Sequence, residues 1–307
     1  MTQHLTSQRQ AASAASRDVR HAATGLPISV GPWQLVEPLH LGETTSTYLA
    51  KPSDHSDGPC QYVVKVLSKD SASDGPACTA IRREAYVGRK VSHPHLISVL
   101  DANVQSEPYF LTMPLVAGET LRQAMRRQPI LPAPVVFWII RQVADALSGL
   151  HAAGWIHGDV KPENILIAPD GHVTLLDLGF AQQMTEERSA VQQQIMGTFN
   201  YISPESITST WGSDGRSDLY SLGATMYETL SGRLPLMGRT LAELATQHRQ
   251  AKPACIRSLV PDLLKPAASL VHRLLAKHPL RRPQTALEVV RELITLEVET
   301  FADRQVA

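Results

Sequence analysis

The sequence has little of what marks several large classes of protein. Its 307 residues include only three cysteines, Cys60, Cys78 and Cys255, which are widely spaced and form no Cys-x-x-Cys pair. An odd number at such spacing disfavours a disulfide framework and a zinc site. Acidic and basic residues balance at 29 each, so no overall charge points to nucleic acid or to an anionic membrane. We therefore expect partners to be recognised by local features.

Long apolar runs are also scarce. No stretch approaches the roughly 18 uninterrupted apolar residues of a membrane helix. The first residues are rich in Ser, Gln, Ala and Arg and lack the apolar core of a signal peptide. We therefore expect a soluble protein of the reducing cytoplasm, with no membrane span. Residues 1–31 are expected to form a disordered leader and residues 301–307 a short tail.

What the sequence does contain is a concentration of polar groups between residues 155 and 179. Two carboxylates, an ammonium and an amide come together there, from Asp159, Asp177, Lys161 and Asn164. Two apolar runs are joined through Pro169-Asp170-Gly171, and this predicts a β-hairpin because Asp-Gly accepts the positive φ angles of a tight turn. The hairpin would bring the oxygens of Asn164 and Asp177 to one Mg²⁺, which shares its shell with substrate phosphates.

This stretch resembles the catalytic loop and metal-binding motif of the eukaryotic-type, or Hanks-type, serine/threonine protein kinases, H-R-D-x-x-x-x-N and D-F-G. The motifs occur here as His157-Gly158-Asp159 through Asn164 and as Asp177-Leu178-Gly179. The resemblance implies that Asp159 accepts or orients the proton of the incoming hydroxyl and that Lys161 contacts the γ-phosphate. It implies metal binding by Asn164 and Asp177, with Mg²⁺ or Mn²⁺ as the ion.

The first part of the chain offers strand-like pieces at 33–36, 47–50 and 62–67, followed by a helix and two further strands at 97–104 and 109–113. Tyr62-Val63-Val64-Lys65-Val66 alternates, so Val64 and Val66 should be buried on one face with Lys65 on the other. The strand resembles the V-A-I-K strand of the kinases. By that resemblance Glu84, on the following helix, holds the Lys65 ammonium at the phosphates through an ion pair.

The resemblance also implies a nucleotide site. Leu41 to Leu49 takes the place of the loop G-x-G-x-x-G-x-V over the ATP phosphates, Met113 that of the gatekeeper and Leu115 that of the hinge. Glu119 would meet the ribose, although a solvated acid at a helix start explains it equally well. The implied cofactor-binding residues are Leu41, Gly42, Thr44, Leu49, Lys65, Met113, Leu115, Glu119, Asn164 and Asp177.

The sequence departs from the family pattern at three places: glycines are missing from one loop, and glycine replaces another residue at two positions. Only Gly42 remains of the glycine loop, with Thr44 and Thr47 at the other two positions, so we expect weakened nucleotide binding. Gly88 replaces an apolar residue one helical turn after Glu84 and leaves a gap. Gly158 replaces the arginine of H-R-D, which in many kinases pairs with a phosphate on the activation segment. Our hypothesis is that activity depends little on such a phosphate.

The segment from Gly197 to Glu205 resembles the serine/threonine pattern G-T-x-x-Y-x-[AS]-P-E. It implies that Thr198 bridges Asp159 and Lys161 in catalysis and that Glu205 pairs with Arg282 further along the chain. Asp218 is suited to cap the next helix and to bind backbone amides of the catalytic loop. Glu163 either favours basic residues next to the phosphoacceptor or is a solvated loop residue, and the sequence leaves both open.

The expected fold is α+β and bilobal, resembling the protein kinases. Residues 32–116 would form a small lobe of antiparallel strands with one helix, plus the hinge, and residues 117–300 a larger, mainly helical lobe. The implied activity is transfer of the γ-phosphate of ATP to Ser or Thr of proteins, including autophosphorylation, as in soluble bacterial members. A separate sensor or a dimer partner is a further expectation, and no nucleic-acid partner is expected. The alternatives are a pseudokinase acting as a nucleotide-binding scaffold and a small-molecule kinase.

Overall fold

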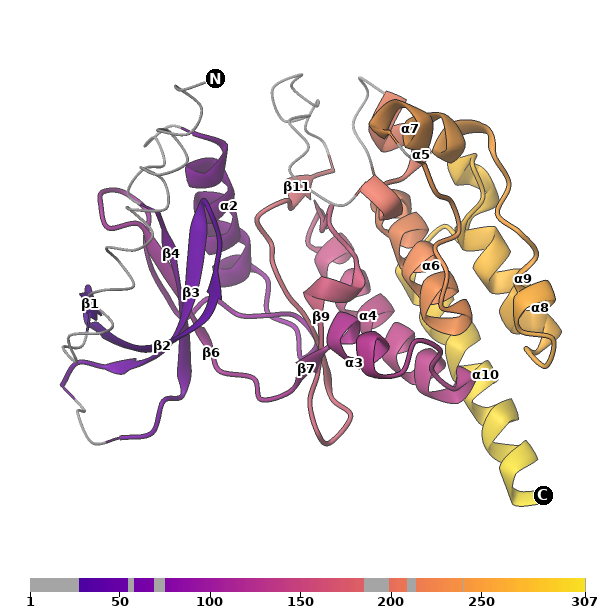
Figure 1. Ribbon diagram of the computed structural model, residues 1–307, viewed down its shortest axis with the longest axis horizontal. Coiled ribbons are helices and arrows are strands. Elements are labelled where there is room, and N and C mark those ends of the chain that lie inside the picture. The colour runs from indigo at the N-terminus through magenta and orange to yellow at the C-terminus, as the bar shows by residue number, and fades with distance from the viewer. Residues whose placement is uncertain are drawn as a thin grey trace, which may run out of the picture. The chain divides into compact units, whose positions relative to one another are not determined.

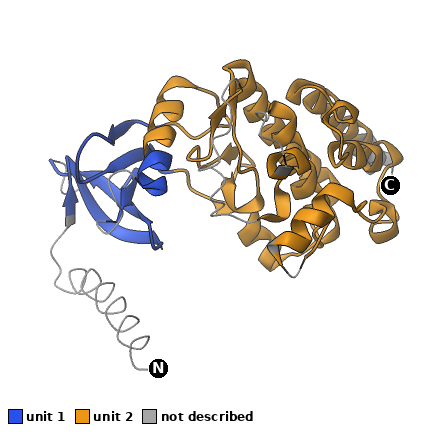
Figure 2. Cartoon of the chain, turned by 90° about the horizontal axis from the view of Figure 1, so that it is seen from above, with its two compact units in different colours: residues 1–81, 99–115 blue, residues 82–98, 116–307 orange. Residues whose placement is uncertain are grey.

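The computed structural model describes residues 28–54, 58–68, 75–184, 199–208, 214–238 and 240–306 (Figure 1). These residues form two compact units, drawn in blue and orange in Figure 2. The first contains the residues up to Ile81 together with Val99–Leu115, and the second contains Arg82–Ser98 and the chain from Val116 onward. The sequence assigned residues 82–98 to the small lobe, whereas the structure groups them with the second unit.

The first unit is a six-stranded antiparallel sheet of order β1-β2-β3-β4-β6-β5. Its strands are β1 (Ile28–Val30), β2 (Trp33–Leu41), β3 (Thr45–Pro52), β4 (Tyr62–Leu67), β5 (Asp101–Asn103) and β6 (Phe110–Pro114). The strand pieces expected from the sequence are all found, with β5 shorter than its predicted range. β1 was missed, because Ile28–Val30 lay within the predicted leader; these residues pair with β2.

The alternation of β4 gives the sheet two different faces. Val64, which is fully buried, packs with Ala50 and Phe110 on one face, and Val66 lies against the same cluster. On the other face Leu67 and Leu111 pack with Cys78 and Ile81 of α2 (Pro76–Lys90). Since neighbouring residues of a strand point to opposite faces, Lys65 belongs to the second face, as its sequence pattern predicts.

The second unit is mainly helical. Its helices are α3 (Leu121–Arg127), α4 (Ala133–Ala152), α5 (Pro204–Thr208), α6 (Gly215–Ser231), α7 (Leu241–Gln250), α8 (Ile256–Leu259), α9 (Lys265–Leu274) and α10 (Ala286–Val306), with single 3₁₀ turns at Pro162–Asn164, Phe199–Tyr201 and Pro279–Arg281. Three short strands, β7 (Glu119–Thr120), β9 (Ile165–Ile167) and β10 (Val173–Leu175), form a small sheet. β8 (Trp155–Ile156) pairs with β11 (Gln182–Gln183).

Helices α4 and α10 run side by side in this unit (Figure 1). Within the described residues α4 is the one helix whose length and composition would suit a membrane span, but it packs as a core helix against α6, α10 and β10. The apolar residues of Pro134 to Ala153 predict a buried helix, and this prediction is wrong for Val135 and Trp138, which are half exposed. The apolar periodicity of Leu287, Val290, Leu293 and Ile294 predicts a closing helix, which is α10. Leu287 and Ile294 are exposed, while Val290 and Leu293 are buried.

An antiparallel sheet with one helix, followed by a mainly helical region, is the arrangement expected of the α+β kinase-like fold. The expected fold class is therefore confirmed.

Candidate active site

The catalytic loop is anchored by one buried carboxylate. Asp218, in the first turn of α6, accepts hydrogen bonds from the backbone N–H groups of His157 and Gly158, each at 2.8 Å. The side chain of His151 contacts the same carboxylate at 2.8 Å. Burial alone would raise the pKa of Asp218, but these partners hold it below the ordinary value. The predicted binding of loop amides is confirmed, whereas the helix cap is Asp214, whose Oδ1 accepts from the Arg216 amide.

Two of the predicted catalytic and metal-binding side chains, Lys161 and Asn164, contact Asp159. Lys161 Nζ lies 2.7 Å from Asp159 Oδ2, and both side chains are largely shielded from solvent. Asn164 Nδ2 donates to the same Oδ2 and to the backbone carbonyl of Asp159, each at 2.8 Å. Burial raises the pKa of Asp159, a nearby Asp177 charge adds to the rise, and Lys161 opposes it. A raised pKa brings this carboxylate closer to the range useful for a proton acceptor near neutral pH.

The predicted hairpin brings the two expected metal ligands to the same end. Strands β9 and β10 pair in antiparallel register, with Leu175 opposite Ile165. One step beyond, the Leu176 amide donates to the Asn164 carbonyl at 2.8 Å. The turn uses a positive φ at Gly171 only. Asp177 follows directly with φ of 65°, the one non-glycine residue with positive φ in the described part of the chain.

These positions fit a magnesium ion by the chemistry of their donors. Both Asn164 hydrogen bonds to Asp159 use the amide nitrogen, so the Asn164 oxygen is the atom left to face a cation. Among the described residues, no group of three or more His, Cys, Asp or Glu side chains gathers as a metal site. Mg²⁺ at phosphates commonly takes only one or two carboxylate ligands and fills its shell with water and phosphate oxygens. Asn164 and Asp177 are therefore the two protein ligands we would assign.

In the first unit, one sheet face gathers several of the implied nucleotide contacts. Lys65 pairs in register with Thr47 on one side and with Leu111 on the other. Val63, two residues before Lys65, pairs with Leu49 and Met113 in the same way. Because side chains of directly paired residues share a face, Leu49, Lys65 and Met113 lie on one face of the sheet.

The place of the glycine loop is a tight turn between β2 and β3. The Gly42 amide donates to the Thr45 carbonyl at 3.1 Å, and a Cβ at Gly42 would lie 2.7 Å from that oxygen. The Ser68 amide donates to the Thr44 carbonyl at 2.8 Å, and Leu41 is exposed. The turn is thus fixed by backbone hydrogen bonds, and the one retained glycine stands where a side chain would not fit.

Two more of the implied cofactor contacts lie after β6. Leu115 is 38% exposed, and its amide donates to the Gln61 carbonyl at 2.8 Å. Glu119 accepts two hydrogen bonds from Arg127, the shorter at 2.7 Å. The next residue, Thr120, caps α3. Glu119 is thus an ion-paired acid just before the start of α3, and its contact with the ribose stays a prediction.

The remaining implied residues have different surroundings. Glu84 lies on α2 and is 1% exposed, and its pairing with Lys65 stays a prediction. Gly88, one turn later, is buried in the same helix. Thr198 lies outside the described residues, so its bridge to Asp159 and Lys161 stays a prediction.

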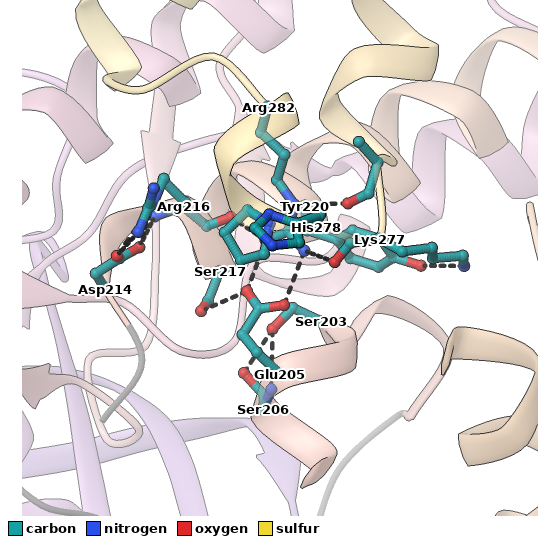
Figure 3. Close-up of polar contacts among 12 residues, drawn as sticks. Ser203, Glu205, Ser206, Asp214, Arg216, Ser217, Tyr220, Lys277, His278 and Arg282 are labelled. Atoms are coloured by element: carbon teal, nitrogen blue, oxygen red, sulfur yellow. Dashed lines mark hydrogen bonds and ion pairs between the residues drawn. The ribbon is translucent and has the colours of Figure 1, made fainter. Parts of the chain in front are cut away.

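The predicted pairing of Glu205 with Arg282 is confirmed (Figure 3). The Arg282 guanidinium donates to both carboxylate oxygens of Glu205, at 2.6 and 2.8 Å. The same guanidinium donates to the backbone carbonyls of Arg216, Ala276 and Lys277. Burial alone would raise the pKa of Glu205, but the Arg282 hydrogen bonds hold it below its ordinary value. The pair therefore links Glu205, at the end of the Gly197–Glu205 segment, to the chain before α10.

Sequence reasoning missed two contributors near the catalytic loop. His151 reaches Asp218 across 67 positions of sequence, and Arg122 reaches Glu228 across 106. Arg122 also contacts Glu163, whose side chain is 40% exposed. No local pattern marks either side chain, because each is defined by a partner on a distant helix.

Comparison with known proteins agrees with this arrangement. The model of the protein kinase domain family matches residues 34–293, so the chain belongs to that family. It is 34% identical over 233 residues to a probable serine/threonine-protein kinase of Clostridium perfringens, covering 75% of this chain and 33% of that protein. Serine/threonine-protein kinase PknB of Mycolicibacterium smegmatis is 34% identical over 270 residues, covering 85% and 42%. PrkC of Bacillus subtilis is 26% identical over 265 residues, covering 86% and 40%.

The expected family is thus confirmed. Protein kinases use ATP, a divalent metal and protein substrates in general. The chain spans 33–42% of the length of these three relatives.

Proposed function

We propose that this chain is an ATP-dependent protein serine/threonine kinase that transfers the γ-phosphate to Ser or Thr hydroxyls. The observation that carries the proposal is the joined set of Asp159, Lys161 and Asn164, with Asp177 at the adjacent hairpin end. Phosphoryl transfer asks mainly for positioning and for neutralisation of charge, and this set supplies a base, a cation and two metal ligands. The serine/threonine-protein kinase names of the relatives support the same assignment.

Each residue has a distinct role in the proposed reaction. Asp159 accepts or orients the proton of the acceptor hydroxyl, and the hydrogen bond from Asn164 fixes the orientation of its carboxylate. Lys161 places a positive charge beside that carboxylate, where the transferred phosphoryl group would arrive. Asn164 and Asp177 would hold Mg²⁺, which neutralises phosphate charge when bound. Lys65, held by Glu84, would contact the phosphates. The rest of the nucleotide would be surrounded by Leu41, Gly42, Thr44, Leu49, Met113, Leu115 and Glu119.

A pseudokinase remains the second candidate because of one observation. The glycine loop is reduced to the tight turn at Gly42, with threonines at the two other positions. A scaffold has no need of the Asp159, Lys161 and Asn164 set, so we favour the enzyme.

We also propose a cytoplasmic location, which the three free cysteines support. A separate sensor or a dimer partner is our proposal for the source of regulation.

The test is phosphate transfer from radiolabelled ATP·Mg²⁺ to the protein itself and to a generic basic protein. Asp159→Asn removes the proposed base, and Asp170→Asn makes the same change at the exposed turn of the hairpin. We expect serine or threonine labelling by the parent and Asp170→Asn, and a loss of at least about a hundredfold in Asp159→Asn. Absence of labelling by the parent, together with an ATP-dependent rise in melting temperature, would establish the pseudokinase instead.

A further inference from the structure

Helix α2 is shared between the two compact units. Its first turns carry Cys78 and Ile81, which pack on the sheet of the first unit. From Arg82 onward the helix belongs to the second unit. Glu84, whose predicted ion pair holds Lys65 at the phosphates, lies in this second half. Whatever fixes the second half of α2 to its surroundings therefore also fixes the place from which Glu84 acts.

Two aromatic rings join this half of α2 to the strand before the catalytic loop. The rings of Tyr86 and Trp155 have centroids 5.7 Å apart and planes inclined at 58°. Tilted aromatic pairs with centroids about 4.5–7 Å apart are favourable, because the positive edge of one ring meets the negative face of the other. Trp155 is 5% exposed and Tyr86 is 53% exposed. The buried indole is therefore a fixed surface, and the tyrosine ring packs on it from the side of α2.

Trp155 borders two segments on which the proposed reaction depends. It lies in β8, just before His157 and the catalytic loop. Its backbone pairs with that of Gln183 in β11, the strand that follows the metal-binding motif. One residue thus contacts α2 through its ring and the start of the activation segment through its backbone. The second half of α2 cannot move away from the strand of the catalytic loop without separating the two rings.

The contact between the rings needs no charged group. Gly158 leaves the catalytic loop without the arginine that pairs with a phosphate in many kinases, and a Cβ there would lie 2.6 Å from the Phe180 carbonyl oxygen. Gly88, one turn after Glu84, takes the place of an apolar residue. Tyr86 lies on the opposite side of α2 from Glu84, because residues two apart in an α-helix are about 200° apart around the axis. The ring pair therefore supplies a contact on that side which neither glycine provides.

We propose that Tyr86 is a positioning residue for phosphate transfer. Its ring, packed on Trp155, holds the second half of α2 to the strand of the catalytic loop and keeps Glu84 in place without a phosphate on the activation segment. The proposal rests on the proposed kinase activity and on the predicted pair of Glu84 with Lys65. The ring carries the effect, whereas the Tyr86 hydroxyl accepts a hydrogen bond from the exposed Lys90 at 3.2 Å.

The experiment measures transfer of phosphate to one peptide by proteins that a phosphatase has treated beforehand. Tyr86→Ala removes the ring and should lower kcat at least about fivefold, since an aromatic pair with its buried area is worth up to about tenfold in an equilibrium constant. The KM for the peptide should stay within about twofold, because Glu84 acts on the transfer step. Tyr86→Phe keeps the ring and should restore kcat to within about twofold of the parent. Lys90→Ala, which removes the partner of the hydroxyl, is the matched control and should not change kcat.

Stability should not account for the difference between these variants. Tyr86 is half exposed and Ala is the better helix former, so Tyr86→Ala should melt close to the parent. If it does not fold, Tyr86→Leu keeps an apolar side chain without the ring and should show the same fall in kcat.

Three results would overturn the inference alone. They are a folded protein without the ring that keeps the kcat of the parent, a Tyr86→Phe protein as slow as Tyr86→Ala, and a parent that loses most of its activity on treatment with the phosphatase. A parent that transfers no phosphate even before treatment would refute the proposed kinase activity, and the inference with it.

Discussion

At the scale of single residues, one residue of the catalytic loop and one of the metal-binding motif have a positive φ, a conformation that most residues avoid. Gly158 has φ of 80°, and Asp177 has φ of 65°. For a residue with a Cβ such a conformation costs about 1–2 kcal/mol, so it persists only where the surroundings enforce it. Asp177 is where the expected metal ligand stands, which agrees with the tendency of strained residues to gather at functional sites.

Gly158 lacks the arginine side chain of the family pattern, and it also stands where a Cβ atom would not fit. A Cβ at this position would lie 2.6 Å from the Phe180 carbonyl oxygen. The hypothesis that activity depends little on activation-segment phosphorylation rested on the missing guanidinium alone. In this structure the loop would have to shift before any side chain, arginine included, could stand there.

We predict that Gly158→Ala lowers the free energy of unfolding by about 2–4 kcal/mol, the sum of the positive-φ cost and the contact with Phe180. Gly154→Ala is the matched control, because Gly154 has φ of 82° and open space where its Cβ would lie. It should cost about 1–2 kcal/mol. Urea denaturation of both variants measures the difference, and equal losses would show that the Phe180 contact is unimportant.

At the scale of elements, the Glu205–Arg282 pair joins α5 to the turn before α10. The Arg282 side chain is fully buried and that of Glu205 is 20% exposed. Tyr220 of α6 lies beneath the guanidinium, with 5.0 Å between Arg282 Cζ and the ring centre. Because the guanidinium also satisfies three backbone carbonyls, its removal leaves several buried polar groups without a partner.

We predict that Arg282→Ala lowers the free energy of unfolding by about 3–5 kcal/mol, as expected when one partner of a buried ion pair is removed. Arg273→Ala breaks the exposed ion pair with Glu292 and should cost at most about 1 kcal/mol. Denaturant melts of the two variants give the comparison. Similar losses in both would mean that burial of the Arg282 pair adds nothing to its strength.

Helix α7 contributes a buried histidine that should make stability depend on pH. His248 is fully buried, with Nδ1 2.9 Å from the Tyr220 hydroxyl. Burial, aided by the positive charge of Lys277, lowers the pKa of His248 from 6.5 to about 4. Between these two values the unfolded chain binds a proton that the folded chain does not, so stability falls as the pH falls through this window.

We predict that His248 lowers the free energy of unfolding by at most about 3 kcal/mol between pH 6.5 and pH 4. His248→Gln, which cannot titrate, should flatten this part of the stability profile, whereas His40→Gln at an exposed strand position should not. Urea melts at several pH values test this. An unchanged slope in His248→Gln would assign the acid sensitivity to other groups.

At the scale of the whole molecule, the family match begins at residue 34 and the described sheet at Ile28. We predict that removal of residues 1–27 leaves phosphate transfer within about twofold of the parent and the melting temperature nearly unchanged, because the family match and the described sheet both begin after residue 27. Removal of residues 1–31 also deletes β1, and with it the buried side chain of Val30, and should cost about 1.5–3 kcal/mol. Activity and melting curves of both truncations are the measurement. A large loss with the shorter deletion would place function within residues 1–27.

Much of the fold and of the candidate site could be predicted from local sequence patterns. The alternation around Lys65 placed Val64 on one sheet face, and Asp-Gly marked the hairpin that brings Asn164 and Asp177 together. The pattern was less reliable on helices. Trp138 and Ile294 continue apolar stripes yet are exposed, since a stripe does not tell how far the neighbouring helix covers it.

The sequence by itself determined the family, the fold class and the identity of the residues in the catalytic loop, because these depend on motifs whose members lie within a few positions of one another. Only the tertiary structure decided how those residues are held and neutralised. His151 reaches Asp218, and Arg122 reaches Glu228 across 106 positions of sequence and Glu163 across 41. Such partners meet only when helices pack, so charge compensation, burial and the pKa shifts that follow are properties of the folded chain.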